Sequence, residues 1–227
     1  MHIVPPRVSL HSLKEFGAHY LMIVLSILTA LGLEAAIENM HHHHAAEAAR
    51  RAIELELRVN LAEVQKNSRA NAQSLQPINA LAEELTRKIE SGEPRPQLVA
   101  AIAQRVKASP INIGLYFPSL RHEAWDVAVA NQAASYLEPA DLARYASIYA
   151  EQRDVTTALP TLFLDAPRFV DAMTDARMGA ADPRDFVRVL NQAAAAVGSM
   201  RNRLDSLQQD LARALAPDAA ASGAAAG

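Results

Sequence analysis

The chain has 227 residues, of which 50% are hydrophobic, 5% aromatic and 21% charged. Its formal net charge of -3 gives no strongly basic surface, so the composition argues against nucleic-acid binding. The sequence contains no cysteine, which excludes disulfides, thiol nucleophiles, iron–sulfur clusters and cysteine-based zinc sites. Alanine accounts for 46 residues, so much of the hydrophobic content is small, helix-favouring side chains that each bury little area.

The dominant feature is an apolar stretch at residues 16–33, 18 residues without Asp, Glu, Lys or Arg. At about 1.5 Å per residue it covers roughly 27 Å, close to the hydrocarbon thickness of a bilayer. Extending it to Ile37 gives the full length, so we predict an uncleaved transmembrane helix, a signal anchor, at 16–37. Two alternatives stay open: a cleavable signal peptide, and a buried helix of a soluble protein.

Charges on either side of the stretch predict its orientation. Arg7 and Lys14 precede it, whereas three glutamates follow before the next basic residue, Arg50. Because positive residues stay on the cytoplasmic side, the N-terminus is expected in the cytoplasm of a bacterium, with the chain in its inner membrane. Residues 1–15 then form a short cytoplasmic tail, and 38–216 a helical domain in the periplasm.

The span also carries small side chains at three- and four-residue spacing, which would let two such helices approach closely. These are Ser26, Thr29, Ala30, Gly32 and Ala36. The expected partners are the lipid bilayer, together with a second copy of the chain or another membrane protein, and no cofactor is expected.

Residues 45–89 show a coiled-coil-like stripe of apolar side chains that alternate steps of three and four. The stripe consists of Leu57, Leu61, Val64, Leu75, Ile78, Ala82, Leu85 and Ile89, with polar Ser68 and Asn71 in its middle. Pro77 removes a backbone donor, so we predict that the helix either bends at 74–77 or breaks there and restarts with Ser74 as its cap.

A stop at Gly92 and two following prolines precedes a predicted helix at 97–108. Residues 109–119 are the only stretch with extended character. They are interpreted as an ordered loop packed over the helices or, alternatively, as a binding loop that uses Ile113, Tyr116 and Phe117.

Two further helices are predicted next, one capped by Ser119 and one opened by Pro139. Together they carry four aromatic side chains, which we interpret as a core cluster or, alternatively, as the wall of a ligand pocket. The four are Trp125, Tyr136, Tyr145 and Tyr149. A shorter helix is expected at 167–177.

The clearest heptad pattern comes last. Asp182 is a predicted N-cap before Pro183, and two rows of side chains then repeat every seven residues. The rows are Leu190, Val197, Leu204 and Leu211, and Ala193, Met200, Leu207 and Ala214. A helix of about 33 residues would be about 50 Å long. That is enough for it to pack antiparallel along the apolar stripe at 45–89 or to pair with its own copy. Residues 217–227 are predicted to be disordered.

The sequence offers one candidate metal site, formed by Glu38, His41, His42 and His44 directly after the span. Helical spacing places two or three of these ligands on one face. The simpler interpretation is a histidine run that faces solvent or lipid headgroups, and pH sensing by the clustered imidazoles is a further alternative. His122 and Glu123 begin like a zinc-protease motif, but Asp126 stands where the second histidine is needed. No catalytic motif is present, so no catalytic residue is assigned and an enzymatic role stays uncertain.

The span and the segment that follows it, HYLMIVLSILTALGLEAAIENMHHHHAAEAARRAIELELRVN, precede a Trp125-bearing helix and a Tyr149-x-x-Gln152 ending. This pattern resembles a group of uncharacterised bacterial single-pass inner-membrane proteins. The resemblance is strongest over residues 16–65, and it implies topology without implying an activity.

The expected fold is all-α, with an N-terminal transmembrane helix that continues into an antiparallel helical bundle whose first and last helices are long and coiled-coil-like. The expected function is a membrane-tethered, non-catalytic protein that presents its extracytoplasmic bundle for protein–protein interaction or self-association. The alternative is an accessory sensor subunit that binds a small ligand or a divalent metal.

Overall fold

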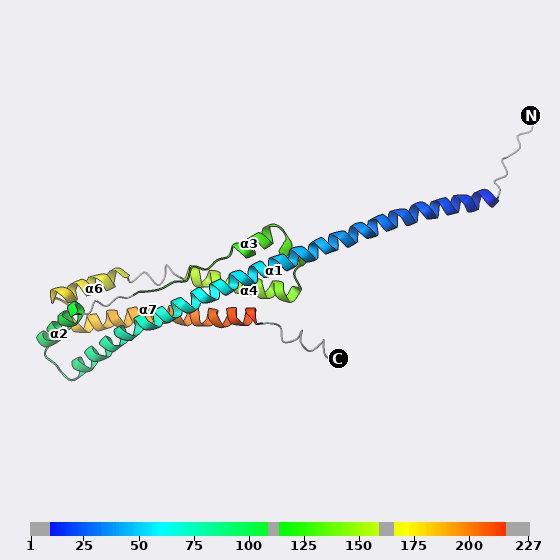
Figure 1. Ribbon diagram of the computed structural model, residues 1–227. Coiled ribbons are helices and arrows are strands. Elements are labelled where there is room, and N and C mark those ends of the chain that lie inside the picture. The colour runs from blue at the N-terminus through cyan, green and yellow to red at the C-terminus, as the bar shows by residue number, and fades with distance from the viewer. Residues whose placement is uncertain (1–9, 109–113, 159–165, 217–227) are drawn as a thin grey trace, which may run out of the picture.

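The computed structural model describes residues 10–108, 114–158 and 166–216, with side chains from residue 14 on and excluding that of residue 166. Within these ranges every regular element is a helix, which confirms the predicted all-α class. Figure 1 shows them in order. They are α1 (Leu10–Glu90), α2 (Arg95–Ala108), α3 (Glu123–Ala130), the 3₁₀ helix η1 (Ala133–Tyr136), α4 (Pro139–Thr157), α6 (Ala166–Met178) and α7 (Pro183–Leu215).

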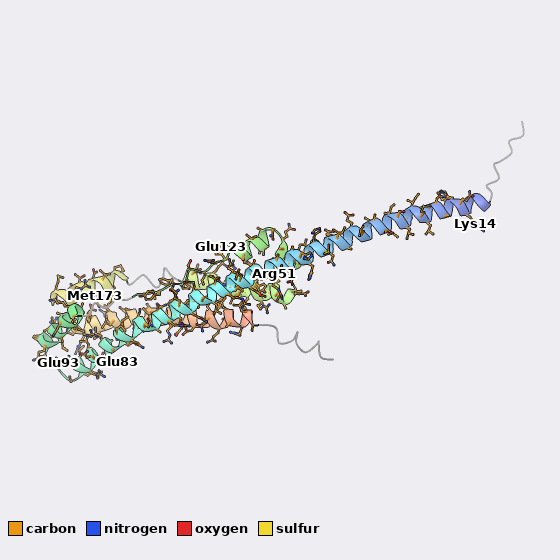
Figure 2. All side chains as sticks on the ribbon, viewed as in Figure 1. Lys14, Arg51, Glu83, Glu93, Glu123 and Met173 are labelled. Atoms are coloured by element: carbon orange, nitrogen blue, oxygen red, sulfur yellow. The ribbon has the colours of Figure 1, made fainter. Side chains whose placement is uncertain are left out.

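Helix α1 is a single element of 81 residues, about 120 Å long. Its N-terminal part projects from the other helices, and Figure 2 shows no other element beside it from Lys14 until Arg51 is approached. Its most apolar 18-residue window has a mean hydropathy of 2.1, and none of that window is buried. This part of α1 is long and apolar enough to cross a membrane, and its exposure does not fit a helix packed in the core of a soluble monomer.

Of the two outcomes predicted at 74–77, the break with a new cap at Ser74 is wrong. Pro77 lies inside α1, and Ser74 Oγ donates to the carbonyl oxygen of Ala70 at 3.1 Å instead of capping a new helix. Proline removes one intrahelical hydrogen bond, but the residues that follow it are held from outside the helix. Ile78 and Leu81 are buried in a core shared with α7, so packing keeps the chain helical across the proline.

Helix α7 has the N-terminus and length that its sequence predicts. Asp182 is the N-cap, and its Oδ1 accepts hydrogen bonds from the backbone N–H groups of Arg184 at 3.0 Å and Asp185 at 3.1 Å. Pro183 occupies the first turn, where its missing N–H costs nothing. The helix runs for 33 residues, and both predicted heptad rows face inward, with Ala193 only partly buried.

Helices α1 and α7 run in opposite directions and meet in two cores. The first core joins Ile53 and Leu57 of α1 to Leu204 and Leu211 near the end of α7. The second core joins Leu85, near the end of α1, to Leu190 near the start of α7. The same α1 face therefore contacts α7 along most of that helix.

The remaining helices complete these cores at opposite ends. Gly92, in the left-handed conformation with φ 77°, ends α1 in a turn where Glu93 N donates to Lys88 O at 3.1 Å. Helices α2 and α6 then cover the second core through residues such as Ile102 and Met173. Helices α3 and α4, with η1, cover the first core, at the end of the domain closest to the projecting part of α1.

Candidate functional site

The histidine run lies on α1 where the projecting helix meets the domain. His42 stacks on Tyr136 of η1, with ring centroids 3.8 Å apart and an interplanar angle of 11°, and its Nε2 lies 3.9 Å from Glu38 Oε1. His41, His43 and His44 are exposed. Among the residues that the structure describes, no three His, Asp or Glu side chains converge to hold a metal ion, so Glu38, His41, His42 and His44 are not brought together as ligands.

Three of the four predicted aromatic residues meet. Trp125 stacks on Tyr149, with ring centroids 5.4 Å apart, and Tyr145 lies in the same core, fully buried. Tyr136 stays apart from them, on His42. Burial raises the pKa of Tyr145 to about 12 and also raises the pKa of Tyr149, so both phenols keep their protons and act as hydrogen-bond donors. Their acceptors are Glu54 and Glu56 of α1.

Two buried asparagines on α1 bind the backbone of the non-helical segment that leads to α3. Asn71 Nδ2 donates to Tyr116 O at 2.9 Å, and Asn71 Oδ1 accepts from Tyr116 N at 2.8 Å. Asn60 Nδ2 donates to Arg121 O at 2.8 Å, and its Oδ1 accepts from Arg121 N at 2.9 Å. Each side-chain amide therefore pairs with both the backbone N–H and the backbone C=O of one residue, as a neighbouring β-strand would.

The spacing of these two contacts follows from backbone geometry. Asn60 and Asn71 are 11 residues apart, which is about three helical turns and about 16.5 Å along α1. Tyr116 and Arg121 are five residues apart, and an extended chain rises about 3.3 Å per residue, again about 16.5 Å. The two distances match, so the segment runs antiparallel to α1 with both asparagines in register.

Glu56 adds the next contact, one turn before Asn60. Its Oε2 accepts from Ala124 N at 2.9 Å and its Oε1 accepts from the Tyr149 hydroxyl at 2.5 Å. Ala124 lies in the first turn of α3, where backbone donors have no partner within the helix. Glu56 therefore caps α3 from another helix, and we call Glu56, Asn60 and Asn71 the polar ladder.

Ser119 was wrongly predicted as the cap of this helix. It is exposed and lies outside α3, whose N-cap residue is His122. The His122 side chain makes no capping bond, and its Nδ1 lies 2.7 Å from Asp126 Oδ2 instead. That hydrogen bond raises the pKa of His122, so the imidazole pairs with a carboxylate on its own helix.

The predicted binding loop is divided. Ile113 lies outside the described residues, whereas Tyr116 and Phe117 belong to the segment tied to α1. A Cβ on Gly114 would lie 2.5 Å from the Tyr116 ring, so glycine is needed for that ring position. Phe117 is partly buried against the first core. This segment is packed onto α1, while the Tyr116 ring is still 40% exposed.

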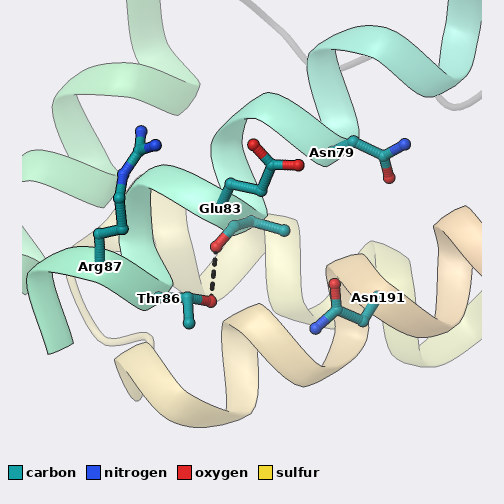
Figure 3. Close-up of a pocket in the computed structure, with 6 residues that line it drawn as sticks. Asn79, Glu83, Thr86, Arg87 and Asn191 are labelled. Carbon is teal, nitrogen blue, oxygen red and sulfur yellow. Dashed lines mark hydrogen bonds between the residues drawn. The ribbon is translucent and has the colours of Figure 1, made fainter. Parts of the chain in front are cut away.

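Two of the grooves between the described helices have no member of the aromatic cluster in their lining. Figure 3 shows one of about 310 Å³, lined by Asn79, Glu83 and Arg87 of α1 and by Asn191 of α7. The other, of about 490 Å³, lies between α1 and α3. Its lining is mostly alanine, and the complete set is Ala45, Ala48, Ala49, Ala52, Glu123, Ala124, Val127, Ala128, Asn131 and Ala133.

An acidic pair links α4 to α7 on the other side of the first core. Partial burial raises the pKa of Glu151 to about 7, and a hydrogen bond to Asp210 and the negative charge of Asp210 contribute. Arg213, which contacts Asp210, offsets part of this rise, and Asp154 adds to it. The pair is most stable when the Glu151 carboxyl is protonated and donates a hydrogen bond to the Asp210 carboxylate.

Sequence reasoning missed most of these polar contacts. Glu56, Asn60 and Glu151 read as ordinary polar positions of amphipathic helices, and Asn71 was noted only as an interruption of the stripe. One signal was present in the sequence, because two asparagines three turns apart lie among the apolar residues of the stripe. Their partners could not be predicted from the sequence, because they are backbone N–H and C=O groups, which almost every residue has.

No known protein family, curated protein or solved structure matches this chain.

The polar ladder predicts a local effect of Asn71→Ala. The substitution leaves the N–H and C=O of Tyr116 without partners, which costs about 1–3 kcal/mol if they stay buried. Amide hydrogen exchange at residue 116 should therefore accelerate by at least tenfold, while exchange at Arg121, held by Asn60, changes little. Asn79→Ala, at an exposed position of the same helix, is the control. Equal exchange at residue 116 in both variants would contradict the ladder.

The Glu151–Asp210 pair predicts a pH dependence of stability. Because the folded-state pKa of Glu151, about 7, lies above its usual 4.5, the folded chain holds a proton that the unfolded chain has lost between those values. The free energy of unfolding should fall as pH rises from about 4.5 to about 7. Glu151→Gln should flatten this slope and stabilise the chain at pH 8 in urea titrations, whereas exposed Glu83→Gln should not. An unchanged slope in Glu151→Gln would rule out this assignment.

Proposed function

We propose that the chain is a single-pass membrane protein without catalytic activity, whose helical domain binds another protein or a second copy of itself. In this proposal residues 16–37 cross the bacterial inner membrane. The N-terminus lies in the cytoplasm and the domain lies in the periplasm as an antiparallel, coiled-coil-like bundle. The proposed likeness to bacterial single-pass inner-membrane proteins rests on the sequence pattern alone.

The observation that carries the proposal is the continuity of α1 across two surroundings. From Lys14 to about Met40 its side chains are almost all exposed and mostly apolar, and from Ala46 on one face is buried by the domain. Water would not favour the first part, whereas hydrocarbon would, because a helix satisfies its own backbone hydrogen bonds there. The absence of a break between the two parts favours a tether that holds the domain at a fixed height.

The outer face of α7 is the surface best suited to a protein partner. It forms an open, shallow groove lined by small or polar side chains, and small side chains allow another helix to approach closely. The lining residues are Ala195, Gly198, Ser199, Asn202, Arg203 and Ser206. The opposite face of α7 packs against α1, so in a monomer this outer face remains exposed for a partner.

A second candidate function is an accessory sensor subunit that binds a small ligand. The α1–α3 groove of about 490 Å³ favours it, since that volume suits a small molecule and the groove is mainly apolar. The aromatic residues do not line this groove, and Tyr145 is fully buried, so the ligand site that the sequence placed among them has little support.

Membrane insertion is tested by replacing Leu25 and Leu28 with arginine. Each arginine near the centre of a span costs about 2.5–3.5 kcal/mol in insertion, so the double variant should leave the membrane fraction after carbonate extraction. Leu55→Arg, at an exposed position of the same helix, should remain with the unmodified chain in the membrane. An unmodified chain that stays in the supernatant without detergent would end the proposal.

A C-terminal reporter enzyme that is active only outside the cytoplasm tests orientation and should be active.

Self-association is tested with single introduced cysteines, which are unique because the chain has none of its own. If copies meet through the outer face of α7, Ser199→Cys in native membranes should form a disulfide-linked dimer on mild oxidation. Arg58→Cys, exposed on α1, should form several-fold less. Equal dimer yields would argue against this face as the self-association surface.

A further inference from the structure

The contact between His42 and Tyr136 is the point at which the domain first touches the projecting part of α1. The two rings are parallel within 11° and 3.8 Å apart, yet Tyr136 is 42% exposed. Stacking of this kind orders both rings, and it leaves the outer side of the tyrosine open. The ring lies at the C-terminal end of η1, which is packed on α1 through Ala133 and Ala134.

Backbone geometry gives the height of this ring pair. Ile37 ends the apolar span, and His42 follows five residues later in the same unbroken helix. Five residues rise about 7.5 Å along the helix axis. The polar headgroup layer on each side of the hydrocarbon is about 5–8 Å thick, so the rings lie at its level, and any tilt of the helix brings them closer to the hydrocarbon.

The chemistry of this end suits a headgroup layer. Tyrosine and histidine each combine an apolar ring body with a polar tip, and tyrosine is enriched where membranes meet water. Three more imidazoles, His41, His43 and His44, are exposed on α1 at the same height and can bond to phosphate and ester oxygens. The carboxylate of Glu38 is also close to the stack, with Oε1 3.9 Å from His42 Nε2.

We propose that the η1 end of the domain rests on the bilayer, with the stacked His42 and Tyr136 rings within the lipid headgroup layer. The occupant of this surface is the same membrane that α1 crosses, so the inference rests on the proposed function. Its consequence is a second attachment beside the span. One helix alone leaves the domain free to rock about the membrane normal, whereas contact through η1 fixes which side of the domain faces the lipid.

Depth-dependent fluorescence quenching tests this proposal, because the chain has a single tryptophan. In a Trp125→Phe background, Tyr136→Trp, Tyr20→Trp and Tyr116→Trp are made separately in the full chain and reconstituted in phosphatidylcholine vesicles whose acyl chains are brominated near the glycerol. Tyr116 is the matched control, since it is 40% exposed but is tied to Asn71, about 50 Å along α1 from the span. Helical content and thermal melting are compared with those of the parent.

The Tyr136→Trp variant should lose about as much emission as Tyr20→Trp, and Tyr116→Trp should lose almost none. Quenching of Tyr20→Trp without quenching of Tyr136→Trp would overturn the inference and leave the membrane tether standing. Quenching of neither would overturn both. Quenching of all three would mean that the domain lies flat on the lipid, which also overturns the proposed attachment through η1. If Tyr136→Trp does not fold, Ser135→Trp, exposed in the same short helix, reports the same height.

Discussion

The hydrogen-bonded continuity of α1 positions every other element of the molecule. An isolated helix in water is only marginally stable, so its persistence needs support from outside the backbone. Beyond Ala46 that support is the apolar face shared with α7, which remains buried on both sides of Pro77. Before His41 no other element of the described residues packs against it, and its apolar side chains are almost all exposed. In the proposed arrangement lipid supplies that support. The N-terminal part of α1 is then stabilised by the bilayer and the rest of the helix by packing against the domain.

Polar residues inside the α1 seam reduce its apolar content but fix its partners. A buried amide is costly unless its groups are bonded, and Asn60 and Asn71 bond theirs to peptide groups that would otherwise be unsatisfied. Ser68 adds a hydrogen bond to Asp205 of α7, which favours one longitudinal register of the two long helices over its neighbours. Apolar packing gives these helices affinity for each other, and the polar contacts select one alignment.

The elements that sequence predicted well are those whose signals are local. The Asp182 cap with Pro183, the heptads of α7 and the Pro139 start of α4 depend on neighbours within a few residues or on one repeating face. The errors at Pro77 and Ser119 arise where a distant element outweighs the local preference. Packing against α7 carries α1 through the proline, and Glu56 supplies the capping oxygen that serine was expected to provide. The polar ladder is composed of such distant contacts, which explains why the sequence did not predict it, although it singled out the aromatic residues and the histidine run nearby.

Continuity also limits how such a protein could transmit a signal. In the described residues, α1 is the only helix that projects from the domain, and it is unbroken between Ile37 and the first core. A change in the membrane-proximal part would therefore reach the domain as a tilt, rotation or axial shift of a rigid rod. The stack of His42 on Tyr136 is the first contact that such a movement would change. η1 is followed directly by α4, which carries the buried Tyr145 and Tyr149. In the proposed arrangement, a binding event at the membrane and a partner on the outer face of α7 would both act on the first core, so the tether would do more than hold the domain at a distance.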